Sequence, residues 1–130
     1  MLIFSLRAVQ VFKKELAHQH FDILHDVQSL GYGLLLLKNL GRPLVTTVHH
    51  PLTIDFQASL ERDQNFREKY YTMVFYPLGM QRRVIRHCDR ILTSSKETTR
   101  EIQRAFGVPA HKIRMVYNGL DADFFHPRDN

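Results

Sequence analysis

Apolar and polar residues follow one another along this chain with periods that change between helix-like and strand-like. From Leu2 to Leu16, apolar residues recur at helical spacing and leave Lys13 and Lys14 on the other side, which predicts an amphipathic helix. Short runs rich in β-branched and aliphatic residues predict strands. The full pattern predicts helices at 2–19, 34–40, 67–87 and 94–106, and strands at 21–27, 44–49, 90–93 and 113–117.

Glycine, proline and serine mark where these elements end. Gly41 and Gly107 close two of the helices, and a kink is expected in the long helix near Pro77. Ser94, followed three residues later by Glu97, predicts a capping box at the start of the last helix. Residues 50–66 show no clear period, and we expect them to form a long irregular loop.

The alternation of helix and strand predicts an α/β fold, with a Rossmann-like parallel sheet of about four strands flanked by helices. In such sheets, ligands bind beyond the carboxyl ends of the strands. Polar residues follow each predicted strand at that end, and we expect them to share one rim of the sheet. These residues are Asp26, His49, His50, Ser94, Ser95 and Asn118.

Composition narrows the class of protein. The chain has 130 residues, 44% hydrophobic and 24% charged, as is typical of one globular domain. A net charge of +5 favours anionic partners, but the basic residues are too dispersed for a general nucleic-acid binder. The lone Cys88 fits a reducing compartment, and no signal peptide or apolar run of membrane-spanning length is present. We therefore expect a cytoplasmic protein that binds no nucleic acid.

Four segments together resemble family-4 glycosyltransferases of the GT-B fold. The first three are the run Phe21–His25, the strand 43–51 that ends in His49 and His50, and the run Cys88–Glu97. The fourth, Lys112–Pro127, is similar to the "N-G-V-D-x-x-x-F-x-P" signature, with Leu120 in place of valine. Each segment alone is a weak signal, and the specificity comes from their order and spacing across residues 21–127.

The resemblance implies that this chain is an incomplete N-terminal half of a GT-B fold. Residues 1–119 would form part of the acceptor-side domain, and residues 120–130 would begin the interdomain linker. The family's first strand and glycine-rich loop and its nucleotide-sugar-binding second domain are not among these residues. Strand 21–27 would neighbour that first strand, so we expect an exposed sheet edge there.

By the same resemblance, the parent enzyme would transfer a sugar from a nucleotide-sugar to an acceptor with retention of configuration. The donor would be a co-substrate bound mainly by the C-terminal domain, no cofactor is implied, and the chain alone would be inactive. Two rivals remain: a stand-alone Rossmann-like module that binds phosphate or nucleotide, and a subunit that pairs with a separate donor domain.

The resemblance also assigns site residues. His49 would face the transferred sugar or the acceptor, since an imidazole can hydrogen-bond a hydroxyl or, when protonated, pair with phosphate. His50, Ser95 and Asn118 are the candidates for binding the acceptor. The alternatives are structural: a strand-end histidine within the fold, a helix cap for Ser94, and a turn for Asn118.

Two further groups of residues allow a binding and a structural interpretation. The histidines between His18 and His50 do not form a pattern of convergent zinc ligands, so no metal site is expected. Aromatic and arginine residues in 67–87 could dock peripherally on an anionic membrane, but their spacing favours packing against the sheet. These residues are Tyr70, Tyr71, Phe75, Tyr76, Arg82, Arg83 and Arg86.

Overall fold

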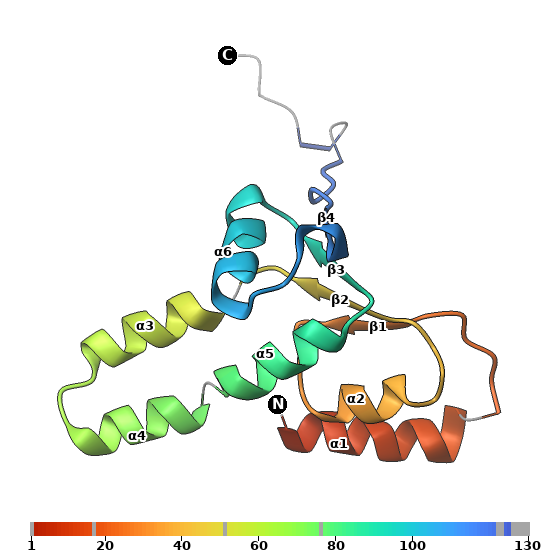
Figure 1. Ribbon diagram of the computed structural model, residues 1–130, viewed down its shortest axis with the longest axis horizontal. Helices are drawn as coiled ribbons and strands as arrows, with labels where there is room; N and C mark the ends of the chain where they lie inside the picture. Colours follow the sequence, from red (N-terminus) through yellow and green to blue (C-terminus); the bar gives the residue numbers. More distant parts are fainter. Residues whose placement is uncertain (1, 17, 51, 76, 122–123, 126–130) are drawn as a thin grey trace.

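A four-stranded sheet, parallel throughout, forms the centre of the computed structural model, which describes residues 2–16, 18–50, 52–75, 77–121 and 124–125 (Figure 1). The strands follow one another in chain order across the sheet. They are β1 (Leu24–Val27), β2 (Leu44–Val48), β3 (Arg90–Thr93) and β4 (Ile113–Met115). The predicted α/β class and the parallel sheet are confirmed, with shorter strands than expected in all but β3. β1 lies at one edge of the sheet, as predicted.

Helices and helical turns precede the first strand and connect the strands. They are α1 (Leu2–Val11), its π-helical continuation η1 (Phe12–Leu16), α2 (Gly33–Lys38), α3 (Leu52–Arg62), α4 (Phe66–Phe75), α5 (Leu78–His87), α6 (Lys96–Phe106) and the 3-10 turn η2 (Ala110–Lys112). α6 ends as predicted at Gly107, whose φ of 64° is the left-handed conformation that glycine adopts without a steric penalty.

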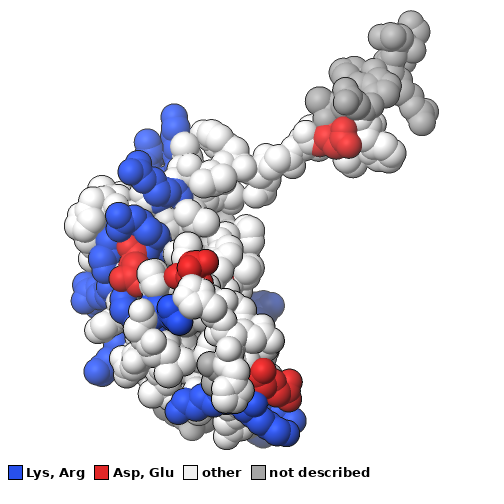
Figure 2. All heavy atoms as spheres, turned by 90° about the vertical axis from the view of Figure 1, so that its right-hand side faces the viewer, with Lys and Arg blue, Asp and Glu red and all other residues white. Residues whose placement is uncertain are grey.

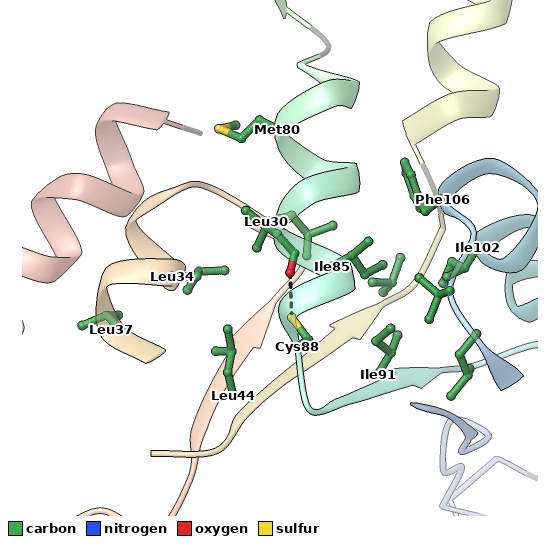
Figure 3. Packing of buried hydrophobic residues seen from close by; sticks show 14 of the residues in the cluster. Leu30, Leu34, Leu37, Leu44, Met80, Ile85, Cys88, Ile91, Ile102 and Phe106 are labelled. Atoms are coloured by element: carbon green, nitrogen blue, oxygen red, sulfur yellow. Dashed lines mark hydrogen bonds between the residues drawn. The ribbon is translucent and has the colours of Figure 1, made fainter. Parts of the chain in front are cut away.

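The hydrophobic core lies on one face of the sheet. Along β2, Leu44, Thr46 and Val48 are buried and alternate with partly exposed residues. Their neighbours on this face pack against α2, α5 and α6, whose side chains point toward one another in Figure 3. The labelled core residues are Leu30, Leu34, Leu37, Leu44, Met80, Ile85, Cys88, Ile91, Ile102 and Phe106.

α1 packs on α2 instead of directly on the sheet, and small residues allow a close approach there (Figure 1). The Gly33 N–H donates to Ser5 Oγ at 3.2 Å, and a Cβ on Gly33 would lie 2.1 Å from the Ser5 carbonyl oxygen. Ser5 and Val9 are the buried residues of α1, whereas Leu2 and Leu6 are exposed. The predicted helix face is therefore only partly correct, because the contact with α2 selects small residues.

Two predictions for residues 50–87 are wrong. The expected loop contains α3, which has no glycine or proline, includes the helix formers Gln57, Ala58 and Leu60, and has Phe56 and Leu60 partly buried. The expected kinked helix is two helices, because Pro77 lacks the N–H that would continue α4 and instead precedes α5. α3 and α4 pack on each other as a hairpin that projects from the sheet (Figure 1).

A carboxylate joins the elements at the amino end of β2. Asp89 Oδ2 accepts a hydrogen bond of 2.8 Å from the Leu44 N–H, and its Oδ1 lies 2.9 Å from Lys38 Nζ. Partial burial acts to raise the pKa of Asp89. The hydrogen bonds from Leu44 and Lys38 and the charges of Lys38 and Lys112 outweigh it, so the pKa lies below its ordinary value.

Candidate functional site

A pocket of about 270 Å³ lies at the carboxyl ends of β2, β3 and β4. Residues from all three strand ends converge on it, which is where ligands bind in open parallel sheets. Its lining consists of Thr47, His49, Leu92, Thr93, Ser94, Val116, Tyr117, Asn118 and Gly119. Two of the candidate site residues, His49 and Asn118, therefore come together, as the rim argument predicted.

His49 is the first residue after β2, and its side chain is exposed at this pocket. Among the described residues its ring makes no hydrogen bond, so both ring nitrogens are available to a ligand. The backbone around it is held firmly. The His49 N–H donates to Gln28 Oε1 at 2.8 Å, and the His49 carbonyl accepts from Thr98 Oγ1 at 3.0 Å.

The two serines after β3 have exchanged the roles expected of them. Ser95 is the N-cap of α6, because its Oγ accepts a hydrogen bond of 3.0 Å from the Thr98 N–H. Ser94, predicted to be the cap, instead lines the pocket. Glu97 pairs with Arg100 at 2.6 Å. The prediction was wrong by one residue because Ser94, and not Ser95, stands three residues before a glutamate, the spacing of a capping box.

Asn118 and Gly119 follow β4 and form part of the pocket wall. The chain reaches them in extended form, since the Val116 N–H donates to the Thr93 carbonyl at 2.8 Å and prolongs the β3–β4 pairing. Asn118 is exposed, so its amide is open to a ligand. Further along, the Phe124 N–H donates to Asp121 Oδ1 at 3.1 Å.

His50 and Asp26 lie outside the pocket lining. His50 Nε2 is 3.1 Å from Asp55 Oδ2 in the first turn of α3, so its ring is engaged with that helix. Asp26 is buried, and its Oδ2 accepts from the Ser29 N–H at 3.1 Å and from Thr46 Oγ1 at 2.9 Å. Asp26 lies near the carboxyl end of β1, as predicted. Hydrogen bonds within the fold occupy its carboxylate, so we do not count it among the pocket residues.

Other surfaces offer weaker sites. A hollow of about 540 Å³ runs along α1, but α1 and η1 alone line it, so its polar side chains come from one continuous helical segment. In the described residues there is no cluster of three or more His, Cys, Asp or Glu side chains able to hold a metal ion. Figure 2 shows Lys and Arg on one face of the molecule in separate groups with acidic residues among them.

The aromatic residues of α4 do not pack against the sheet as predicted. The side chains of Tyr70 and Tyr71 are 54% and 56% exposed, and their rings contact each other with centroids 6.0 Å apart. The side chains of Phe75 and Tyr76 lie outside the described residues. On α5, Arg86 Nε donates to the Phe106 carbonyl at 2.6 Å and so ties α5 to the end of α6. Within the described residues, no helix is long and apolar enough to cross a membrane.

Comparison with known proteins gives a consistent result. The family model for Glycosyltransferase Family 4 matches residues 1–124. The chain is 36% identical over 126 residues to an MMP alpha-(1->4)-mannosyltransferase of Mycolicibacterium hassiacum, covering 97% of this chain and 30% of that protein. It is 26% identical over 123 residues to a D-inositol 3-phosphate glycosyltransferase of Thermomonospora curvata, covering 92% of this chain and 27% of that protein. The chain thus spans less than a third of the length of these curated relatives.

Proposed function

Because this chain belongs to glycosyltransferase family 4, we propose that it supplies the acceptor side of a sugar-transferring site, located at the pocket between β2, β3 and β4. The observation that carries the proposal is the meeting of His49, Ser94 and Asn118 at this pocket. They come from three different strand ends and present an imidazole, a hydroxyl and an amide. Such groups bind the hydroxyls of a sugar through directed hydrogen bonds.

The proposed reaction is transfer of a sugar from a nucleotide-sugar to an acceptor, with retention of anomeric configuration. His49 would contact the transferred sugar or the acceptor, and Ser94 and Asn118 would orient the acceptor. Ser95, a candidate from the sequence, would act indirectly, as the cap of α6. Holding two substrates in a reactive geometry accounts for much of the rate enhancement in such reactions, and charge on the leaving group is stabilised by fixed donors. No metal ion is required in this scheme.

We propose that the nucleotide-sugar is held mainly by residues beyond these 130. The two relatives are more than three times as long as the region they share with this chain, which leaves room in them for a donor-binding part. Residues 1–130 alone are therefore expected to show negligible turnover. An assay with labelled nucleotide-sugars and a panel of acceptors measures this, and clear transfer of label would contradict it.

Acceptor binding is the direct test, and it needs no turnover. The names of the relatives suggest two probes, a mannose oligosaccharide and D-inositol 3-phosphate. Titration of either into ¹⁵N- and ¹³C-labelled chain should shift the NMR signals of His49, Ser94 and Asn118 together. His49→Ala should weaken the binding about tenfold or more, as expected for loss of a hydrogen bond to a ligand in a pocket.

The matched control is His111→Ala, which removes an exposed histidine on η2, outside the pocket lining. It should leave the binding unchanged. UDP and GDP serve as the competing probes. If a nucleotide binds tightly and shifts these three residues while neither acceptor does, the chain is a nucleotide-binding module and the acceptor-side proposal fails.

A further inference from the structure

We infer that Gln28 is a positioning residue for His49: its side-chain amide bonds the His49 N–H and the His50 carbonyl, one on each side of the His49–His50 peptide, and so sets the direction in which the His49 ring faces the pocket. The inference rests on the function proposed above and adds a residue to it. Gln28 is the first residue after β1, the strand that pairs with β2, and it does not itself line the pocket.

Both ends of the Gln28 amide bond to backbone groups of the two residues that follow β2. Its Oε1 accepts from the His49 N–H at 2.8 Å, and its Nε2 donates to the His50 carbonyl at 3.0 Å. The Gln28 N–H donates to the Thr47 carbonyl at 2.9 Å and continues the β1–β2 ladder. The side chain therefore extends that ladder by two more hydrogen bonds, beyond the point at which backbone pairing stops.

The turn that carries Gln28 is held in an uncommon backbone conformation. Gln28 has a φ of 54° and Leu30 a φ of 44°, a region that non-glycine residues seldom occupy. The Asp26 carboxylate accepts from the Ser29 N–H, the Leu30 N–H and the Ser29 hydroxyl. A buried carboxylate with these partners keeps the turn in place, and unfavourable backbone conformations persist only where the surroundings determine them in this way.

A second group holds the His49–His50 peptide, which lies between the two backbone groups that Gln28 bonds. Thr98 Oγ1, in the first turn of α6, donates to the His49 carbonyl at 3.0 Å, and the Thr98 N–H is capped by Ser95. His49 is thus fixed between the turn after β1 and the start of α6, although its ring is exposed. Fixing the backbone on both sides limits the imidazole to its side-chain rotamers, the condition for a preorganised site.

Two substitutions and a matched control test this inference. Gln28→Ala removes both hydrogen bonds, whereas Gln28→Glu keeps an acceptor for the His49 N–H and removes the donor to the His50 carbonyl. Gln57→Ala removes an exposed glutamine of α3 from outside the clamp. Each is made in the 130-residue chain, and urea unfolding is recorded alongside, so that a change in global stability is measured separately.

The first readout is local. In Gln28→Ala, amide hydrogen exchange of His49 should rise about fivefold or more relative to residues in β2 and β3, as expected for the loss of one net hydrogen bond. The His49 ring signals should broaden or split as the ring samples several directions. Gln28→Glu should leave the His49 amide protected while the ring signals still change, and Gln57→Ala should alter neither.

The second readout is binding of D-inositol 3-phosphate or the mannose oligosaccharide. Gln28→Ala should weaken it about threefold to tenfold, while the control does not. Unchanged His49 exchange and ring signals in Gln28→Ala would overturn the inference, as would an increase in exchange spread evenly over the whole chain. If the unmodified chain bound neither probe, the proposed function would be refuted instead. The role of Gln28 would still be tested, because the hydrogen-exchange measurement needs no ligand.

Discussion

Apolar side chains are buried on the packed face of the sheet, whereas many of those on the α3–α4 hairpin are exposed. On the sheet, aliphatic side chains such as Ile91 and Leu44 are fully buried between the strands and α2, α5 and α6. On the hairpin, Phe66 is 82% exposed and Val74 62% exposed, and the two helices pack chiefly on each other. The apolar content of an element does not by itself determine how far its side chains are buried. Burial also requires another layer of the fold against which the element can pack.

This difference indicates which of the two regions contributes more to the stability of the fold. Side chains that leave water on folding contribute about 25 cal/mol per Å² of apolar surface, and those on the hairpin leave water only in part. The sheet and its three helices should therefore behave as the cooperative unit, with the hairpin as a weakly coupled appendage. The first two experiments below compare the two regions directly, and the other two compare a packed position with an exposed one.

The reactivity of thiols should separate the two regions most strongly. Cys88 is fully buried, and its pKa is raised to about 12, chiefly by burial and further by the charge of Asp26. At pH 8 its thiolate fraction is lower than that of an exposed thiol by a factor of about 10³. Alkylation of native protein followed by mass spectrometry should leave Cys88 unmodified, whereas the thiol created by Tyr70→Cys should react readily. Rapid labelling of native Cys88 would mean that the core opens.

Truncation of a core residue should produce the largest loss of stability. Ile91→Ala leaves a cavity at the centre of the sheet and should lower the free energy of unfolding by about 2–5 kcal/mol. Ile54→Ala, on the half-exposed surface of α3, should cost about 0.5 kcal/mol or less. Urea denaturation measures both values, and equal losses would show that the hairpin belongs to the cooperative core.

Substitution of glycine tests the close contact between α1 and α2. The new Cβ in Gly33→Ala would collide with the Ser5 backbone, so this change should cost about 1–3 kcal/mol. In Gly79→Ala the Cβ meets no atom within 4 Å, and alanine in α5 should stabilise the protein by about 0.5–1 kcal/mol. Thermal unfolding of both variants gives the sign. A neutral Gly33→Ala would place α1 farther from α2 than the structure does.

The smallest expected effect concerns acid stability. Because the pKa of Asp89 is lowered in the folded state, its contribution is present above its ordinary value of 3.8 and is lost as the pH falls from there through the lower folded pKa. Asp89→Asn should therefore reduce stability at pH 7 and make the further loss of stability below about pH 4 smaller. Asp22→Asn, at a side chain 91% exposed, should leave the pH profile unchanged. A series of urea titrations between pH 3 and pH 7 measures both.

Local sequence pattern was sufficient for the strands and for much of the site. The β-branched runs at residues 44–48 and 90–93 form strands, and parallel pairing brings their carboxyl ends to one rim, so His49 and Asn118 could be placed together without the structure. The fold class and the family likewise followed from the order of these segments. Each depends on spacing along the chain, which a sequence displays directly.

Tertiary packing decided the features that the spacing of residues along the chain did not predict. The choice between Ser94 and Ser95 as the cap depended on where α6 begins, and the clamp of Gln28 on the His49 backbone depended on a turn that Asp26 holds in the left-handed region. The hairpin of α3 and α4 was hidden because its residues show no strong apolar face. The sequence by itself thus determined the strands, most of the helices and their order, through short-range periodicity. Only the tertiary structure decided which side chains face the pocket, because that depends on hydrogen bonds between residues more than twenty positions apart.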